Sequence, residues 1–171
     1  VISPAERIGQ KDPLSQGILP EVLDATIVLP FNDAAAVEKA LSEHDVAAII
    51  LEPIPHNIGS VLPKPGFLER LRELATKHGT VLVFDEVMTS RLSPGGLQAL
   101  LGIRPDLTTL GKYLGGGMSF GAFGGRADVM ALFDPSSGHA LPHAGTFNNN
   151  VLSMAAGLAG LTRVLTPDVQ Q

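Results

Sequence analysis

The sequence has 171 residues, of which 44% are hydrophobic and 17% are charged, with a formal net charge of −5. This composition excludes a disordered chain, allows one domain with a substantial core, and argues against nucleic acid as a partner, because phosphate binding needs a basic surface. Cysteine is absent, which excludes disulfides and thiolate metal sites and favours a cytoplasmic location. No apolar run approaches the roughly 20 residues of a membrane helix, so no membrane association is expected.

Apolar runs and helical periodicity alternate along the chain after an irregular start over residues 1–24, which Pro4, Pro13 and Pro20 interrupt. Strands are predicted over 25–29, 46–51, 80–84, the run ending before Lys112, and 121–125. Helices are predicted over 34–44, 67–78, 97–101, 128–133 and from about Asn150 onward, with loops over 53–65 and 134–145.

This order of strands and helices, with continuous rather than alternating apolar strands, is typical of an α/β fold with a mainly parallel sheet flanked by helices. The first residue is Val1 rather than Met, and the last are Gln170 and Gln171. We therefore expect residues 1–171 to form a single, incomplete domain of a longer protein.

Polar residues follow three of the predicted strands at their carboxyl ends: Glu52, then Asp85 and Glu86, then Lys112. The carboxyl ends of parallel strands lie along one edge of a sheet, where open α/β folds bind ligands. Asp85 and Lys112 are separated by about one crossover and one strand, so they are expected to be neighbours. A plain ion pair between them is the alternative interpretation.

The residues around Asp85 indicate which side chains share a face. In an extended segment residues i and i+2 point the same way, so Asp85 and Val87 share one face and Glu86 points to the other, toward a structural partner. A carboxylate beside a β-branched apolar group suits a flat heteroaromatic ring with a basic nitrogen.

Lys112 is followed by the triple glycine 115–117, which allows a sharp turn or a close approach to a bound group. A lysine in a partly dry pocket is a usable nucleophile, although a surface lysine is the simpler interpretation. A Walker A loop is excluded because Asp106 and Tyr113 occupy its Gly and Ser/Thr positions. The glycines lack the third Gly of a dinucleotide fingerprint, and the five histidines lack metal-ligand spacing.

Thr146 precedes the last predicted helix, within the segment AGTFNNN (144–150). Free N–H groups and a hydroxyl at such a place can bind phosphate. An Asn or Thr helix cap without a ligand is the alternative.

Several ordered motifs together resemble one family: VFDEVMT (83–89), PDLTTLGK (105–112), GGGM (115–118), GAFGGR (121–126) and GTFNNN (145–150). They are similar to the class III aminotransferases, pyridoxal-phosphate enzymes of fold type I, and within them to the β-phenylalanine aminotransferase and glutamate-semialdehyde aminomutase groups. The resemblance covers the chain from about residue 26 and implies the central part of the family's large, cofactor-binding domain.

The resemblance implies a role for each matching residue. Lys112 matches the Schiff-base lysine, which forms an aldimine with pyridoxal 5'-phosphate. Asp85 matches the partner of the ring nitrogen, Val87 the residue packed on the ring, and Met88 a residue beside the ring's phenolic oxygen. Thr146 matches the threonine that reaches the phosphate of the neighbouring subunit's cofactor, which implies a homodimer with shared sites. The sixth match, Glu52, is a Glu-Pro strand end near the substrate, with a substrate-binding or structural role.

The implied activity is transfer of an amino group between an amino acid, of the β-amino class, and a 2-oxo acid. Two alternatives stay open: an aminomutase of the semialdehyde type and a non-catalytic truncated module. The family's phosphate-binding loop, its ring-stacking aromatic residue and its small C-terminal domain have no counterpart in these 171 residues.

Overall fold

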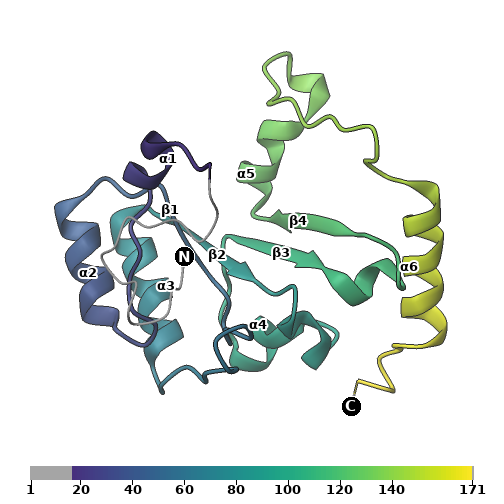
Figure 1. The fold of residues 1–171 in the computed structure, drawn as a ribbon, viewed down its shortest axis with the longest axis horizontal. Helices are drawn as coiled ribbons and strands as arrows, with labels where there is room; N and C mark the ends of the chain where they lie inside the picture. The colour runs from purple at the N-terminus through teal and green to yellow at the C-terminus, as the bar shows by residue number, and fades with distance from the viewer. Residues whose placement is uncertain (1–16, 171) are drawn as a thin grey trace. The chain divides into compact units, whose positions relative to one another are not determined.

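The computed structural model describes residues 17–170, so most of the irregular segment expected over residues 1–24 lies outside the described residues. Its strands form one sheet in the order β1-β2-β3-β4, with β1 at Ala48–Leu51, β2 at Val81–Asp85, β3 at Leu107–Gly111 and β4 at Gly121–Gly125 (Figure 1). β2 and β3 are parallel, and β4 returns antiparallel to β3. The α/β fold is confirmed, and its sheet is mixed because β4 follows β3 through a short turn rather than a helical crossover.

The chain divides within β2 into two compact units, residues 1–82 and 83–171. Each is described separately below. The single-domain expectation stays a prediction.

The N-terminal unit contains α1 (Pro20–Asp24), α2 (Ala34–Glu43) and α3 (Phe67–His78), of which α2 and α3 lie side by side (Figure 1). The helix predicted over 67–78 is confirmed as α3, which buries Leu74 completely and Leu71 almost completely. The N–H of Ala36 donates to the Asp33 side chain at the start of α2, a cap that stabilises a helix by about 1 kcal/mol. Gly79 ends α3 in a left-handed conformation.

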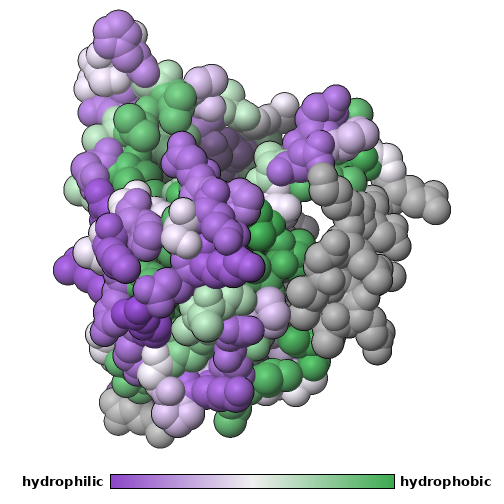
Figure 2. All heavy atoms as spheres, turned by 90° about the vertical axis from the view of Figure 1, so that its left-hand side faces the viewer, coloured by the Kyte–Doolittle hydropathy of each residue, from purple (hydrophilic) through white to green (hydrophobic). Residues whose placement is uncertain are grey.

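Charged residues lie on the outward face of α2 and α3. Arg70 donates to Glu38 of α2 at 2.9 Å and to Glu73 of its own helix at 3.0 Å. The Arg70 hydrogen bond lowers the pKa of Glu38. Figure 2 shows hydrophilic residues across much of the corresponding side of the molecule, with apolar residues between them. Because these ion pairs are exposed, they contribute little to stability.

Two predictions for the start of this unit are wrong. Residues 20–24 form α1 rather than an irregular loop, because Pro20 at the first helical position fixes a helical φ and needs no N–H partner. Residues 25–29 have strand composition but form no strand. Composition alone does not make a strand, which needs a neighbouring edge with which to exchange ladder hydrogen bonds.

The C-terminal unit continues from β2, and its described residues form three helices and four single 3₁₀ turns. The helices are α4 (Gly96–Leu101), α5 (Ala127–Met130) and α6 (Val151–Arg163); the turns are η2 (Thr89–Leu92), η3 (Lys112–Gly115), η4 (Ala131–Phe133) and η5 (Pro135–Ser137). The helices and the glycine-rich strand predicted here are confirmed to within a few residues.

α6 packs closely against η3, the turn that follows β3. The approach requires glycine on both sides: a Cβ on Gly116 would overlap the Ala156 carbonyl, and one on Gly157 would overlap the Leu114 carbonyl oxygen. Gly116 also has a positive φ of 58°. The Ser153 hydroxyl adds a 2.9 Å hydrogen bond to the Ser119 carbonyl.

The segment between η5 and α6 is attached to β4 by aromatic contacts. The His143 ring packs edge-on against Phe123 of β4 at 5.4 Å and against Phe133 at 5.8 Å. Asn150 then caps α6 by accepting the N–H groups of Leu152 and Ser153. No helix between residues 17 and 170 is long and apolar enough to cross a membrane.

Candidate active site

The parallel pairing of β2 with β3 determines which residues meet at the carboxyl edge of these two strands. Asp85 is the last residue of β2 and pairs with Thr109 of β3. β3 ends at Gly111, so Lys112 follows directly at the same edge. The sequence prediction that Asp85 and Lys112 come from neighbouring strand ends agrees with this register.

Asp85 keeps part of its carboxylate available. Its Oδ1 accepts the N–H of Val87 at 3.0 Å, and the side chain is half-buried. Among the described residues Asp85 forms no ion pair, so the plain Asp85–Lys112 salt bridge is not formed. The Thr109 hydroxyl, on the residue paired with Asp85, is buried and has no hydrogen-bond partner in the described part of the chain.

Val87 lies against the backbone of Gly111, the residue that directly precedes Lys112. A Cβ added to Gly111 would lie 3.6 Å from Val87 Cγ1 and 3.7 Å from Cγ2, so the Val87 methyl groups lie directly beside the Gly111 backbone. The Phe120 carbonyl oxygen would be 3.1 Å from the same Cβ. Because residue 111 is glycine, the Val87 methyl groups and the Phe120 carbonyl can both lie close to the backbone directly before Lys112.

Lys112 has a backbone conformation that is uncommon for a residue with a side chain. Its φ is 53°, in the left-handed region, at the first position of η3. Such a conformation costs of order 1–3 kcal/mol and is often found at functional sites. The side chain is exposed and has no ion pair or hydrogen bond to any described residue. Its amine is accordingly available for chemistry.

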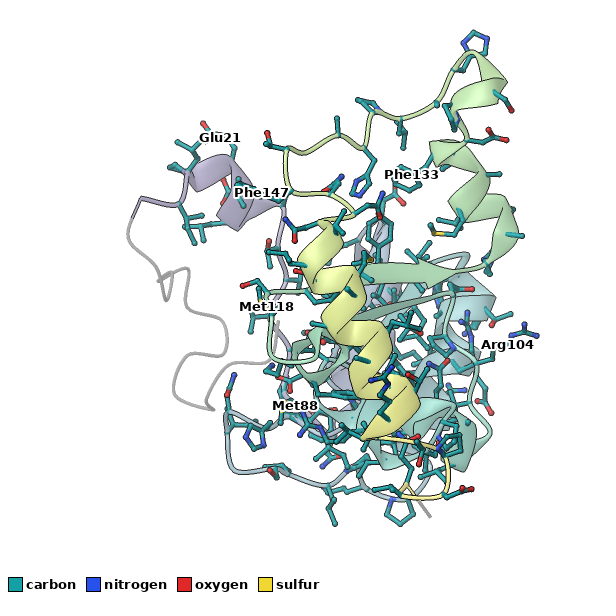
Figure 3. The ribbon with its side chains drawn as sticks, turned by 90° about the vertical axis from the view of Figure 1, so that its right-hand side faces the viewer. Glu21, Met88, Arg104, Met118, Phe133 and Phe147 are labelled. Carbon is teal, nitrogen blue, oxygen red and sulfur yellow. The ribbon has the colours of Figure 1, made fainter. Side chains whose placement is uncertain are left out.

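Met88 and Thr146, two further predicted site residues, lie at different positions in this unit. Met88 is half-buried and immediately precedes η2. Thr146 is exposed, in a turn closed by the Asn148 N–H donating to the Gly145 carbonyl. Figure 3 shows the neighbouring Phe147 on the segment that leads into α6. Thr146 is not the cap of α6, because Asn150 has that role.

Glu52 belongs to the N-terminal unit. It follows β1 directly, is half-buried, and its Oε2 accepts the N–H of His56 at 3.2 Å. This hydrogen bond organises the start of the proline-rich loop. The substrate-binding role of Glu52 stays a prediction.

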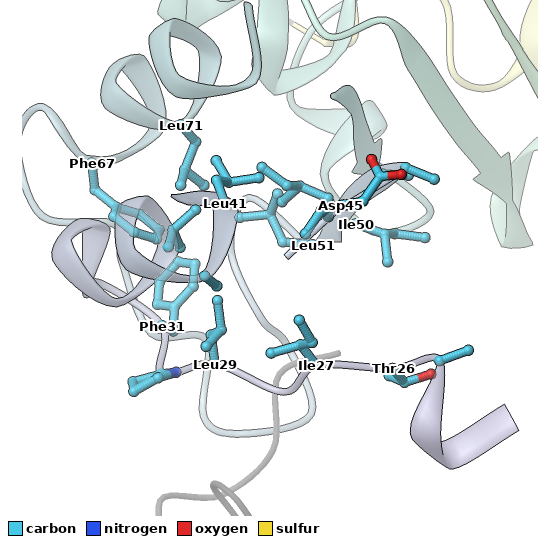
Figure 4. A pocket seen from close by; sticks show the side chains of 18 residues that line it. Thr26, Ile27, Leu29, Phe31, Leu41, Asp45, Ile50, Leu51, Phe67 and Leu71 are labelled. Carbon is cyan, nitrogen blue, oxygen red and sulfur yellow. The ribbon is translucent and has the colours of Figure 1, made fainter. Parts of the chain in front are cut away.

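A cavity of about 600 Å³ also lies in the N-terminal unit, between residues 25–31, α2, α3 and β1 (Figure 4). Its lining is mainly apolar, including Ile27, Phe31, Leu41 and Ile50, and Asp45 is the one ionisable residue among the described residues that line it. No predicted site residue lines this cavity, so its size does not make it the candidate active site.

The sequence did not reveal the partners of two charged side chains, Arg126 and Glu86, although Glu86 was expected to have a structural partner. Arg126, just after β4, donates to the nearly buried Asp106 at 3.0 Å and also pairs with Asp128. The Asp128 hydrogen bond raises the pKa of Arg126, and Arg126 in turn lowers the pKa of Asp128. The Glu86 carboxylate accepts the N–H groups of Leu97 and Gln98 at the start of α4. The adjacent acidic and basic residues were visible in sequence, but their partners were not.

No group of three or more potential metal-ligating side chains occurs in the described part of the chain.

Comparison with known proteins identifies the family. The family model described as "Aminotransferase class-III" matches residues 13–171. The chain belongs to the class-III aminotransferases. The fold and the family resemblance predicted from the motifs are therefore confirmed.

Two relatives and one solved structure show how similar this class-III aminotransferase chain is to known proteins. It is 60% identical over 144 residues to a β-phenylalanine transaminase from Variovorax paradoxus, covering 83% of this chain and 33% of the relative. It is 50% identical over 159 residues to a glutamate-1-semialdehyde 2,1-aminomutase from Bordetella avium, covering 91% and 37%. A solved structure described as a transaminase with PLP bound matches with a TM-score of 0.84 and 39% identity, covering 90% and 37%. The chain thus spans about a third of the length of these relatives.

Proposed function

We propose that the protein carrying this chain is a pyridoxal-phosphate-dependent aminotransferase that moves an amino group between an amino acid and a 2-oxo acid. The observation that carries the proposal is the β2–β3 register, in which Asp85 and Lys112 end neighbouring parallel strands. Membership of the class-III family supports the same reaction class.

The residues at this edge fit pyridoxal phosphate. Asp85 has one oxygen committed to Val87 and one without a partner among the described residues, which suits a protonated ring nitrogen. Val87 and Gly111 offer a narrow apolar wall for a flat ring. When bound, the cofactor supplies an electron sink for carbanion chemistry.

In this proposal each of the predicted site residues has a separate role. Asp85 holds a proton on the ring nitrogen, and Val87 packs on the ring. Lys112 supplies the amine that holds the cofactor and, when free, the base that moves a proton from substrate carbon. Met88 would contact the ring oxygen, and Glu52 would have a role in binding substrate.

A β-amino acid is the proposed amino donor, because the transaminase relative at 60% identity is named for β-phenylalanine. The second candidate is an aminomutase of the semialdehyde type, which the relative at 50% identity favours. A non-catalytic module is the third reading. Incubating the full-length protein with β-phenylalanine, with and without a 2-oxo acid, separates them: turnover that requires the 2-oxo acid supports transamination. Conversion of glutamate-1-semialdehyde without any acceptor supports the aminomutase.

Cofactor attachment has a direct test. The full-length protein is mixed with pyridoxal phosphate and reduced with borohydride, and the modified peptide is identified by mass. Modification at Lys112 is expected. Modification spread over other lysines, or none, would contradict the proposal and leave the non-catalytic module.

We also propose that the protein is a homodimer in which Thr146 contacts the phosphate bound to the other subunit. Apolar side chains next to Thr146 are unusually exposed: Phe147 at 81%, Val151 at 79% and Leu152 at 66%. A second copy covering them would bury apolar surface, which favours association. Thr146→Ala is expected to weaken cofactor binding while the protein sediments as a dimer.

The cytoplasmic location stays a prediction, which cell fractionation would check.

A further inference from the structure

Glu86 is a fully buried carboxylate that the proposed reaction does not use. Its side chain has no solvent exposure. Oε2 accepts the N–H of Leu97 at 2.7 Å and the hydroxyl of Thr89 at 3.0 Å, and Oε1 accepts the N–H of Gln98 at 2.9 Å. These two N–H groups belong to the first turn of α4, where helix N–H groups lack partners within the helix. The carboxylate therefore replaces its lost hydration with three donors.

The backbone of Glu86 is held as firmly as its side chain. Its N–H donates to the Thr109 carbonyl of β3 at 3.1 Å, and its carbonyl accepts the Ser90 N–H of η2 at 2.9 Å. One residue is thus bonded to β3, η2 and α4. It stands between Asp85 and Val87, the two residues proposed to contact the cofactor ring.

Gly96 keeps open the space that the carboxylate needs. A Cβ at this position would lie 2.7 Å from Glu86 Oε2 and 3.0 Å from its Cδ, and the φ of Gly96 is +74°. Any side chain there would push the carboxylate away from the Leu97 and Gln98 N–H groups. The glycine at the start of α4 therefore leaves the space that the Glu86 carboxylate occupies.

We propose that Glu86 is a positioning residue of the active site: its attachment to α4 fixes the Asp85–Val87 turn so that Asp85 faces the ring nitrogen. This inference rests on the proposed function. Glu86 follows β2 directly, so a backbone rotation at residue 86 would change the direction of Val87 relative to Asp85. The carboxylate on α4 prevents that rotation.

The test is Glu86→Gln in the full-length protein. The amide keeps the shape but presents an NH₂ group to one of the α4 N–H donors, which leaves a buried donor without an acceptor. Pyridoxal phosphate is expected to bind about tenfold more weakly in an absorbance titration. The pH midpoint of the bound cofactor's visible absorbance is expected to shift, because Asp85 no longer holds the ring nitrogen in place.

A double-mutant cycle separates positioning from general destabilisation. In an Asp85→Ala background, Glu86→Gln is expected to add little further change to the pH midpoint while still lowering thermal stability. Leu74→Ala, in the core of the N-terminal unit, is the matched control: it lowers stability without shifting the midpoint. Equal midpoint shifts from Glu86→Gln with and without Asp85 would overturn the proposal.

Thr89→Val offers a milder second variant, because it removes one of the three donors and leaves both N–H bonds. A smaller shift of the midpoint in the same direction is expected, and an unchanged midpoint in both variants would overturn the inference. Failure of borohydride to modify Lys112 in the wild type would instead refute the proposed function. The two failures are therefore distinguishable.

Discussion

The attachment of β4 to β3 depends on a glycine that has no room for a side chain. A Cβ on Gly125 would overlap the Asp106 carbonyl oxygen and lie 2.8 Å from Leu107 Cα. These are backbone atoms, so no flexible side chain can move aside. The Asp106 carbonyl also accepts the Arg126 N–H at 2.8 Å, so displacing it breaks that bond as well.

We predict that Gly125→Ala destabilises the β3–β4 pair by about 2–4 kcal/mol. Overpacking contributes about 1–3 kcal/mol and the lost hydrogen bond about 0.5–1.5 kcal/mol. Gly124→Ala is the matched control in the same strand, because a Cβ there meets nothing within 4 Å. Replacing a strand glycine by alanine at such a position is expected to be neutral or to stabilise by about 0.5 kcal/mol.

Amide hydrogen exchange on peptides covering residues 107–111 and 121–126 measures this locally. Gly125→Ala is expected to speed exchange about thirtyfold or more, since each 1.4 kcal/mol corresponds to about a factor of ten when exchange follows local opening. Gly124→Ala is expected to leave the rates unchanged. Similar exchange in the two variants would refute the argument that backbone proximity at Gly125 holds β4 in register.

Three further outcomes are expected. Asp85→Ala removes turnover while borohydride still attaches the cofactor to Lys112, because the amine is intact; unchanged turnover would remove Asp85 from its assigned role. Arg126→Ala lowers the melting temperature at neutral pH, and its difference from wild type shrinks as pH falls below about 4. Arg126 lowers the pKa of Asp128, and this interaction stabilises the fold fully only at pH values above the pKa of Asp128 in the unfolded chain. A difference in melting temperature that does not depend on pH would therefore contradict the ion pair. Leu74→Ala, at a fully buried position, costs about 2–5 kcal/mol in denaturant unfolding, whereas Leu62→Ala, exposed at 68%, stays within about 0.5 kcal/mol.

The elements that sequence predicts well are those whose signal is local. The α3 helix follows from apolar residues at helical spacing and ends at Gly79, where a left-handed residue is needed. β2 and β3 follow from short apolar runs ending in polar residues. The neighbouring positions of Asp85 and Lys112 required only one additional rule, that parallel strands share a carboxyl edge.

The elements that sequence predicts poorly are those decided by a distant partner. Residues 25–29 have the composition of a strand, but pairing depends on an available edge. The triple glycine 115–117 predicts the turn that the structure has, but not that Gly116 meets the backbone of α6, 40 residues later. No periodicity in either segment indicates that contact. The same holds for Arg126 and Asp106, which are joined only when β4 folds back on β3.

Asp85 and Glu86 show how one local rule assigns different tasks to chemically similar residues. Strand alternation sends the two carboxylates to opposite faces. Glu86 meets the start of α4, where three donors satisfy it and burial makes it structural. Asp85 meets one N–H and keeps an oxygen without a partner among the described residues, which leaves it able to hold a proton on a ligand. The alternation can be predicted from the sequence. The difference in the number of hydrogen bonds that the two carboxylates accept cannot, because it depends on where α4 begins and on the space left by glycine at position 96. The proposed catalytic carboxylate is thus the one that the fold leaves incompletely satisfied.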